Sequence, residues 1–180
     1  MFKRLQIMGP SGSGKSTLAQ AAAARLGIPY HELDAVFWGP NWTPKPRDAF
    51  RESVARIVAN DSWAIGANYS VVRDVIWSRA DAVVWLDLPL RLTLWRLLRR
   101  TLKRIVTRET LWADNHETWR DAFFSRDSLF PFAVRQHSRF RRELPAALAN
   151  LAQQGVSTWR FRSTHEVEAW LAALVDRAPA

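Results

Sequence analysis

The stretch Gly9-Pro10-Ser11-Gly12-Ser13-Gly14-Lys15-Ser16-Thr17 decides how the rest of the chain is interpreted. It satisfies the spacing Gly-x4-Gly-Lys-[Ser/Thr], in which a glycine-rich turn follows a strand and opens a helix. Apolar residues at positions 5, 7 and 8 predict a short buried strand before the turn. Helical spacing predicts a helix over residues 15–26, and Gly27 stands where it should end. The stretch therefore predicts a phosphate-binding loop.

Each part of this loop has a chemical reason. Glycines let the backbone turn so that successive N–H groups point at one anion. The helix that opens after Gly14 aims its positive end at the same anion. We expect Lys15 to reach the β- and γ-phosphates of ATP, and Ser16 to offer its hydroxyl to Mg²⁺. A chance glycine- and serine-rich turn would need neither the strand before it nor the helix after it.

Length and composition restrict the class of protein. The 180 residues suit one α/β domain, so we expect a single domain over 1–180. Without cysteine the chain has no disulfide, thiolate metal site or thiol nucleophile. The first residues, Met1 to Arg4, lack the apolar run that is typical of a signal peptide, and no apolar run approaches the length of a membrane span. We expect a soluble, cytoplasmic protein that does not bind a membrane.

The net charge of +9 is concentrated in one part of the chain. Residues 91–142 hold 13 Lys and Arg against 5 Asp and Glu, whereas the remainder is nearly neutral. Such a basic region indicates a polyanionic partner, either nucleotide phosphates or nucleic acid. An arginine-rich solvated surface is the alternative, so charge alone does not decide.

Two acids follow predicted strands. Asp34 ends the strand expected over 28–34, and Asp87 ends the apolar run 81–87. Ligands of open parallel sheets lie at the carboxyl ends of strands, so both acids are candidates for Mg²⁺. Asp34 is also suited to accept a proton from a substrate hydroxyl, or to cap a helix.

Residues 35–44 are aromatic and interrupted by prolines, which predicts a loop. Its tryptophans, Trp38 and Trp42, are suited equally to the floor of a substrate pocket and to core packing. The helix expected over 47–60 carries Arg47 and Arg51 away from its apolar face, where they could reach a substrate anion.

Helices and strands alternate to the end of the chain. A helix after Pro89 is expected to bury a stripe beginning at Trp95, residues 107–132 are the least periodic section, and a further helix covers 133–152. A fifth strand is expected over 156–161, and Ser163 to Glu166 has the spacing of a capping box. This order predicts an α/β fold, a three-layer α/β/α sandwich around a five-stranded parallel sheet.

Several motifs together resemble a known family. They are the loop at 9–17 and the segments 31–38, 67–69, 80–89 and 111–120. The chain resembles the adenylate-kinase-like P-loop kinases, and more closely the bacterial group of DNA topology modulation proteins, or adenylate kinase-related ATPases. This resemblance implies a nucleotide-kinase-like P-loop NTPase with a helical, arginine-rich lid over about 107–124.

The resemblance also assigns roles to residues. Arg96 and Arg100 stand where such kinases place one arginine near the base and one on a phosphate. Lid arginines that contact phosphate would be Arg108 and Arg120, whereas the phosphoryl acceptor would face Asn68, Tyr69 and Arg73.

One position departs from the family pattern. Relatives carry an acid that helps hold Mg²⁺ where this chain has Gly66. Asp34 and Asp87 would then have to suffice for the metal, or turnover would be weak. We expect an ATP- and Mg²⁺-dependent kinase whose acceptor, a small molecule or a nucleotide, is not identified. A nucleotide-switched nucleic-acid-binding protein and a regulatory ATPase are the alternatives.

Overall fold

A computed structural model of the chain describes residues 2–119, 122–123 and 128–174. Five strands form one parallel sheet in the order β2-β3-β1-β4-β5. The strands are β1 (Arg4–Met8), β2 (Tyr30–His31), β3 (Trp63–Gly66), β4 (Ala82–Leu86) and β5 (Ser157–Phe161). The predicted five-stranded parallel sheet is confirmed.

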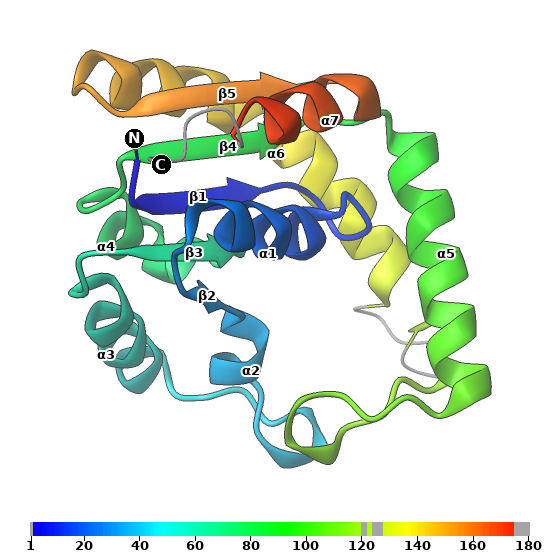
Figure 1. The fold of residues 1–180 in the computed structure, drawn as a ribbon. Coiled ribbons are helices and arrows are strands. Elements are labelled where there is room, and N and C mark those ends of the chain that lie inside the picture. The colour runs from blue at the N-terminus through cyan, green and yellow to red at the C-terminus, as the bar shows by residue number, and fades with distance from the viewer. Residues whose placement is uncertain (1, 120–121, 124–127, 175–180) are drawn as a thin grey trace.

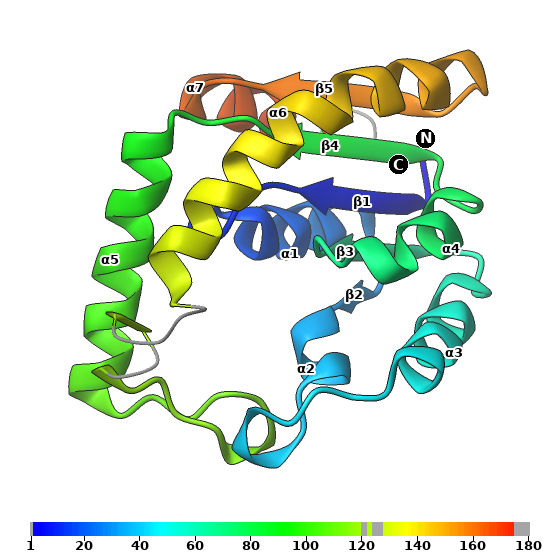
Figure 2. The same ribbon diagram turned by 180° about the vertical axis from the view of Figure 1, so that it is seen from behind.

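Helices cover both faces of this sheet (Figures 1 and 2). They are α1 (Lys15–Leu26), α2 (Leu33–Phe37), α3 (Arg47–Val58), α4 (Arg73–Trp77), α5 (Leu90–Thr107), α6 (Leu129–Gln153) and α7 (Thr164–Ala173), with the 3-10 turns η1 (Pro40–Trp42), η2 (Ser70–Val72) and η3 (Trp112–Asp114). None of the helices in the described ranges is both long and apolar enough to cross a membrane.

Alternate residues of the central strands enter two separate cores. Leu5 and Ile7 of β1 pack with α1 and α7, while Met8 packs with α3, α4 and α6. In β4, Val84 faces the α1 side and Val83 the α6 side. Because side chains alternate along a strand, a sheet covered on both faces needs apolar residues at nearly every position. The three-layer α/β/α sandwich is therefore confirmed.

The structure corrects two local predictions. Asp34 lies in the first turn of α2 rather than at the end of a strand, and α2 takes in part of the predicted loop. On α5 the buried residues are Thr93, Leu97 and Thr101, whereas Trp95 is 57% exposed. The predicted inward stripe was wrong because α5 turns its polar threonines toward the loop after β1: the Thr93 carbonyl lies against Gly12. The described part of the predicted lid contains the turn η3, and Trp119, Ala122 and Phe123 are also helical, so the helical lid stays a prediction.

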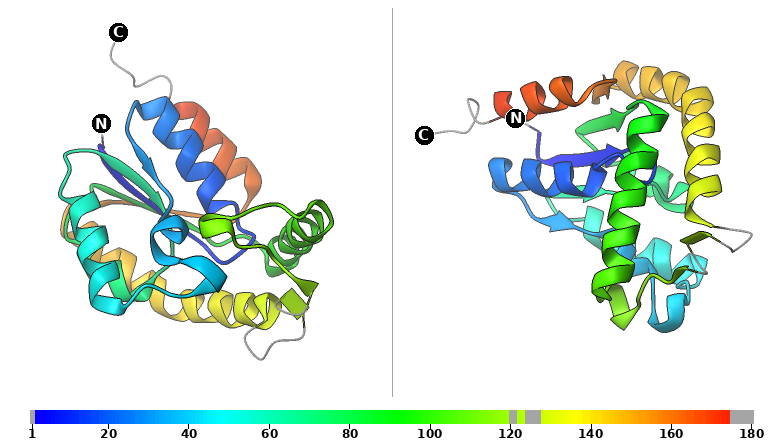
Figure 3. Two further views of the ribbon diagram at one scale, coloured as in Figure 1. Left: turned by 90° about the horizontal axis from the view of Figure 1, so that it is seen from below. Right: turned by 90° about the vertical axis from the view of Figure 1, so that its right-hand side faces the viewer.

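All strand arrows point toward the side where α5 stands (Figure 1). The chain after α5 then meets the segment around η1, so that α2, η1, η3 and α5 surround the carboxyl ends of the strands (Figures 1 and 3). This arrangement places the loop at 9–14, the acid in α2 and the arginines of α5 around one region.

Candidate active site

The loop between β1 and α1 has the backbone of an anion cradle. Gly12 and Gly14 adopt φ of 82° and 88°, in the left-handed region that side chains disfavour. A Cβ on Gly12 would lie 2.2 Å from the carbonyl oxygen of Thr93, so only glycine fits there. Helix α1 begins after Gly14 with neither a side-chain cap nor an acid in its first turn. The first N–H groups of α1 therefore remain available for an anion.

Two amide side chains hold this loop from outside. The Asn68 carbonyl oxygen accepts the N–H of Gly9 at 3.0 Å, and its amide nitrogen donates to the Gly9 carbonyl. Gln136 of α6 accepts the N–H of Ser11 at 3.1 Å. Asn68 therefore supports the loop with both ends of its amide, and its role toward the acceptor stays a prediction. Gln136 was missed because nothing local in the sequence links it to the loop.

Four charged groups converge on the loop. Burial lowers the pKa of Lys15, the positive charge of Arg100 lowers it further, and Asp34 opposes both effects. Glu32 also raises the pKa of Lys15, so both acids lie within electrostatic reach of the ammonium group. A partly buried cation beside free helix N–H groups fits the phosphates of a nucleotide.

Each of the two acids accepts a hydrogen bond from a tyrosine. Tyr69 donates its hydroxyl to Asp34 Oδ1 at 2.5 Å, and Tyr30 donates to Glu32 Oε2 at 2.5 Å. Burial, followed by the charge of Asp34, raises the pKa of Tyr69, so its phenol stays protonated and remains a donor. The sequence prediction included Tyr69 but not Glu32 or Tyr30.

The prediction that Asp87 binds a metal ion is corrected by the ion pairs that this residue forms. Its Oδ1 accepts Arg141 Nε at 2.7 Å, and its Oδ2 accepts Arg160 Nη2 at 2.6 Å. The carboxylate is 1% exposed, so two arginines enclose it between α6 and β5. Its charge is already neutralised, which leaves it as a structural ion pair and not a metal ligand.

The remaining metal candidates are Ser16 and the acids beside it. The described residues contain no cluster of three His, Cys, Asp or Glu side chains that could hold a metal. Mg²⁺ keeps several waters and needs only one or two protein ligands beside phosphates, so Ser16 with Asp34 or Glu32 fits this ion. Gly66 cannot be replaced by an acid without movement, because a Cβ there would lie 3.0 Å from Ser16 Cα and 3.1 Å from the Lys15 carbonyl oxygen.

The predicted site arginines of α5 and its end have different surroundings. Arg96 donates to Thr164 Oγ1 at 3.1 Å, at the start of α7. Burial of its guanidinium, and then the charge of Arg104, lowers the pKa of Arg100, although part of the side chain still reaches solvent. Arg108 is exposed at the end of α5, where it adopts φ of 49°. Arg120 lies outside the described residues.

A set of hydrogen bonds, which we call the latch, joins Asn115 and His116 of the predicted lid to Gly39 and Trp42 around η1. Asn115 accepts the N–H of Trp42 and donates to the Gly39 carbonyl, both at 2.9 Å. Trp42 also donates its indole N–H to the His116 carbonyl at 3.2 Å. The base of the lid is fixed by Arg104, which pairs with Glu117 at 2.8 Å. Sequence reasoning missed this latch because its partners lie more than 70 residues apart.

The predicted substrate arginines have different surroundings. Arg47 is exposed at the start of α3. Arg51 forms two hydrogen bonds to Asp74, at 2.8 and 2.7 Å, which tie α3 to α4, so its predicted role at a substrate is not supported. Arg73 lies 3.7 Å from Glu143 of α6, and burial lowers its pKa.

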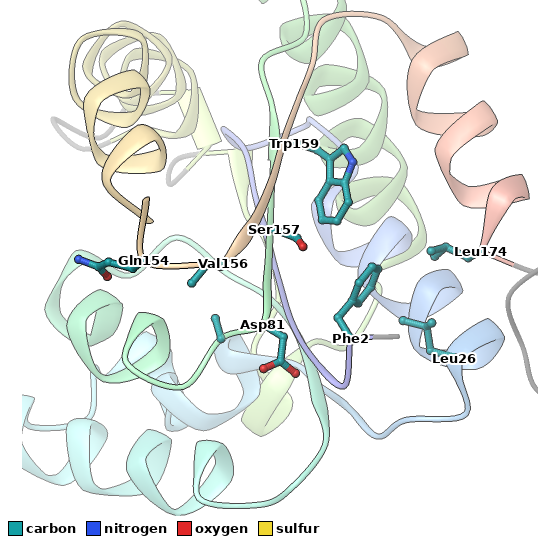
Figure 4. Close-up of a pocket in the computed structure, with 10 residues that line it drawn as sticks. Phe2, Leu26, Asp81, Gln154, Val156, Ser157, Trp159 and Leu174 are labelled. Carbon is teal, nitrogen blue, oxygen red and sulfur yellow. The ribbon is translucent and has the colours of Figure 1, made fainter. Parts of the chain in front are cut away.

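A separate hollow of about 610 Å³ lies at the amino ends of β1, β4 and β5 (Figure 4). Phe2 and Trp159 form its apolar wall, and Asp81 and Ser157 lie at its base. Arg4 already binds the Asp81 carboxylate, at 2.5 and 3.0 Å. Ligands of open α/β sheets bind at the opposite, carboxyl ends, so this hollow is not the candidate active site.

Comparison with curated proteins gives a partial match. No protein-family model matches the chain. YqaC of Bacillus subtilis (strain 168), itself an uncharacterized protein, is 30% identical over 106 residues. The match covers 58% of this chain and 60% of YqaC, so the chain spans about three fifths of that relative's length.

Solved structures are similar over nearly the whole chain. A gluconokinase from Sinorhizobium meliloti 1021 has a TM-score of 0.54 at 21% identity, covering 97% of this chain and 94% of its own. Shikimate kinase from Acinetobacter baumannii, solved with shikimate, has a TM-score of 0.54 at 15% identity, covering 100% and 97%. Shikimate kinase from Bacteroides thetaiotaomicron has a TM-score of 0.56 at 16% identity, covering 98% of both chains. At such identities the similarity concerns the fold alone, and the fold of this chain is that of the P-loop kinases.

Proposed function

We propose that this protein transfers the γ-phosphoryl group of ATP to a hydroxyl group of a small molecule or nucleotide. The observation that carries the proposal is the convergence of Lys15, Asp34 and Arg100 at the cradle after β1. A phosphate-binding loop alone would fit any nucleotide-binding protein. An acid and an arginine beside the lysine add what phosphoryl transfer needs, a proton acceptor and a positive charge at the transferred group.

Each residue has a task in this proposal. Lys15 and the N–H groups of the loop hold the phosphates, and Arg100 neutralises charge that develops as the γ-phosphoryl leaves the β-phosphate. Asp34 accepts the proton of the acceptor hydroxyl, whose oxygen forms the new bond to phosphorus. Mg²⁺, held through Ser16 and an acid, would supply further neutralisation when bound. Positioning and electrostatics, with little covalent chemistry by the protein, provide the catalysis.

The proposal leaves the acceptor open. The similar structures include a gluconokinase and shikimate kinases, so hydroxy acids are reasonable first compounds to test. Nucleoside monophosphates come next, because the motifs quoted above resemble adenylate-kinase-like proteins. The closer resemblance to the DNA topology modulation group keeps a nucleic-acid-binding role as the alternative.

A screen of acceptors with Mg²⁺ and ATP, followed by ADP release, tests the proposal. We expect one acceptor class to raise ADP release above the rate with ATP alone. Lys15→Ala should weaken nucleotide binding by roughly tenfold or more, because a charge-assisted contact contributes about 1.5–3 kcal/mol. Unchanged calorimetric binding in a folded Lys15→Ala variant would show that the loop does not bind nucleotide. ADP release that no acceptor stimulates would favour a regulatory ATPase.

A further inference from the structure

Helix α5 carries an apolar stripe that the fold leaves at the surface. Trp95, Leu98 and Leu102 follow one another at helical spacing, and Val106 continues their line by one more turn. The helix turns its opposite side toward the loop after β1, so Trp95 is 57% exposed and Val106 is 76% exposed. Leu98 and Leu102 are half-buried. The two apolar cores of the described structure include none of these four residues.

The position of α5 makes this stripe accessible. The helix stands at one edge of the molecule, and in the right-hand view of Figure 3 its outer side faces the viewer with the sheet behind it (Figures 1 and 3). Its neighbour among the described helices, α6, lies beside it. We call Trp95, Leu98, Leu102 and Val106, together with the cations next to them, the outer face of α5.

Three cations accompany the stripe. Arg91 precedes Trp95 by one turn, while Arg99 and Lys103 follow one border of the stripe. All three side chains are exposed, and none of them forms an ion pair with an acid of the described residues. Since α5 itself contains no acid, the charge of its outer face is entirely positive. A complementary surface would therefore be apolar with a negative border.

The shape of the stripe indicates a helical partner. Its members are three, four and four residues apart, which is the spacing of the narrow seam along which two helices pack. The stripe covers about three turns, or roughly 16 Å at 1.5 Å per residue. A lipid surface would also attract the cations, but amphipathic helices that enter lipid present a broader apolar face than this seam.

Charge disfavours two other occupants. A second copy packed through the same face would bring Arg99 and Lys103 of both copies together, and like charges across an interface cost free energy. A duplex of DNA would neutralise the cations, yet it would leave Trp95 and Val106 without an apolar partner. We propose that the outer face of α5 docks an amphipathic helix of another protein, with Asp or Glu along one border of its apolar stripe.

Two synthetic peptides test this proposal on the full chain. Both are capped helices of about three heptads with leucines at the seam positions, and they differ only in bordering residues, which are Glu in one and Lys in the other. Fluorescence anisotropy of the labelled peptides measures binding at about 0.1 M salt. We expect the Glu peptide to bind roughly tenfold or more tightly than the Lys peptide, and this difference to shrink as salt rises.

Substitutions on two sides of the molecule localise the binding. Trp95→Ala should weaken binding of the Glu peptide roughly tenfold or more, because large aromatic side chains dominate such contacts. Lys103→Glu should weaken it in the same direction. Arg56→Glu is the matched control, since Arg56 is exposed on α3 at the opposite side of the molecule and the change in net charge is the same. The melting temperature verifies that each variant is folded, and Trp95 and Lys103 are both exposed.

The remaining outcomes each overturn the proposal. Equal binding of the two peptides, no binding of the Glu peptide, or an equal loss in Arg56→Glu and Lys103→Glu would show that α5 does not select an acidic helix. Vesicles of phosphatidylglycerol that sediment with wild type but not with Trp95→Ala would assign the outer face to a lipid surface. A dimer in sedimentation equilibrium that Trp95→Ala dissociates would assign it to a second copy.

Discussion

The side chain of Asn115 accepts a hydrogen bond from the backbone N–H of Trp42 at 2.9 Å, across 73 residues of sequence. Its amide nitrogen donates to the Gly39 carbonyl at the same distance, and the side chain is almost fully buried. Near this contact both segments contain residues with positive φ, including Trp42 at 54° and Ala113 at 54°. Such backbone persists only where surrounding contacts enforce it. The lid and the segment around η1 therefore form one bridged unit.

Asn115→Ala should loosen this unit. It leaves the Trp42 N–H and the Gly39 carbonyl without their partner, a loss of about 1–3 kcal/mol for buried groups. We expect amide hydrogen exchange to speed up by roughly tenfold or more in residues 38–45 and 107–119, measured by mass spectrometry. Asn60→Ala is the control, because the Asn60 side chain donates to the nearby carbonyls of Arg56 and Ile57 at the end of its own helix. Equal exchange in both variants would show that Asn115 does not hold the lid.

Asp34→Asn should lower turnover while keeping the protein stable. The change preserves size and removes the proton-accepting charge, and general bases contribute about 10²–10⁴-fold. The measurements are ADP release with the acceptor identified by the screen, and the melting temperature. Asp61→Asn, at an exposed position after α3, is the matched control. A large loss of stability with activity intact would instead make Asp34 a structural residue of α2.

The contact between Arg51 and Asp74 should make the free energy of unfolding depend on pH in the acidic range. The hydrogen bond from Arg51 holds the pKa of Asp74 at about 2, below its ordinary value of 3.8. A carboxylate with a lowered folded-state pKa stabilises the protein above the unfolded value, and this contribution is lost as pH falls from 3.8 through 2. Because the pair is largely exposed and solvent screens it, we expect this contribution to be small.

Urea denaturation of wild type and Asp74→Asn between pH 6 and pH 2 measures this effect. The wild type should be the more stable near neutral pH, and the difference should shrink below the unfolded pKa. A difference that is constant over this range would exclude Asp74 as the titrating group.

The sequence predicted the sheet and the loop because both depend on local patterns. Apolar runs such as β4 and the glycine spacing before Lys15 each have one structural interpretation in an α/β chain. It could not predict that α5 turns Trp95 outward, because hydrophobicity alone does not say which face of a helix meets a neighbour.

The site was less predictable than the fold. Lys15 and Asp34 follow from their places beside strands, but the partners of a carboxylate depend on contacts that the sequence does not encode locally. Asp87 looked like a metal ligand because it ends a strand, yet the enclosing arginines come from α6 and β5. Asn115 was missed for the same reason, since its importance arises only when distant segments meet.

Arg100→Ala and Arg99→Ala form a matched pair on α5. Arg100 acts on Lys15 and lies within reach of Asp34, whereas the neighbouring Arg99, which is exposed as Arg100 is, is not among the charges that shift the pKa of Lys15. We expect Arg100→Ala to lower ADP release by roughly tenfold or more, as loss of a charged contact to a phosphate does. Arg99→Ala should retain wild-type turnover. Equal activity of both variants would remove Arg100 from the proposed site.

The last prediction concerns nucleic acid. Helix α5 contains no acid, and besides Arg100 its exposed cations are Arg91, Arg99 and Lys103, which are available to a polyanion. If each cation contacts one phosphate, the logarithm of the DNA-binding constant should fall with the logarithm of the salt concentration with a slope of only about 3, at roughly 0.9 per phosphate. We therefore expect weak binding of a labelled DNA duplex near physiological salt, measured by fluorescence anisotropy and unchanged by ATP. Triple replacement of these cations by alanine should abolish what binding remains at low salt. Tight binding near physiological salt that responds to ATP would contradict the kinase proposal and favour a nucleotide-switched DNA-binding protein.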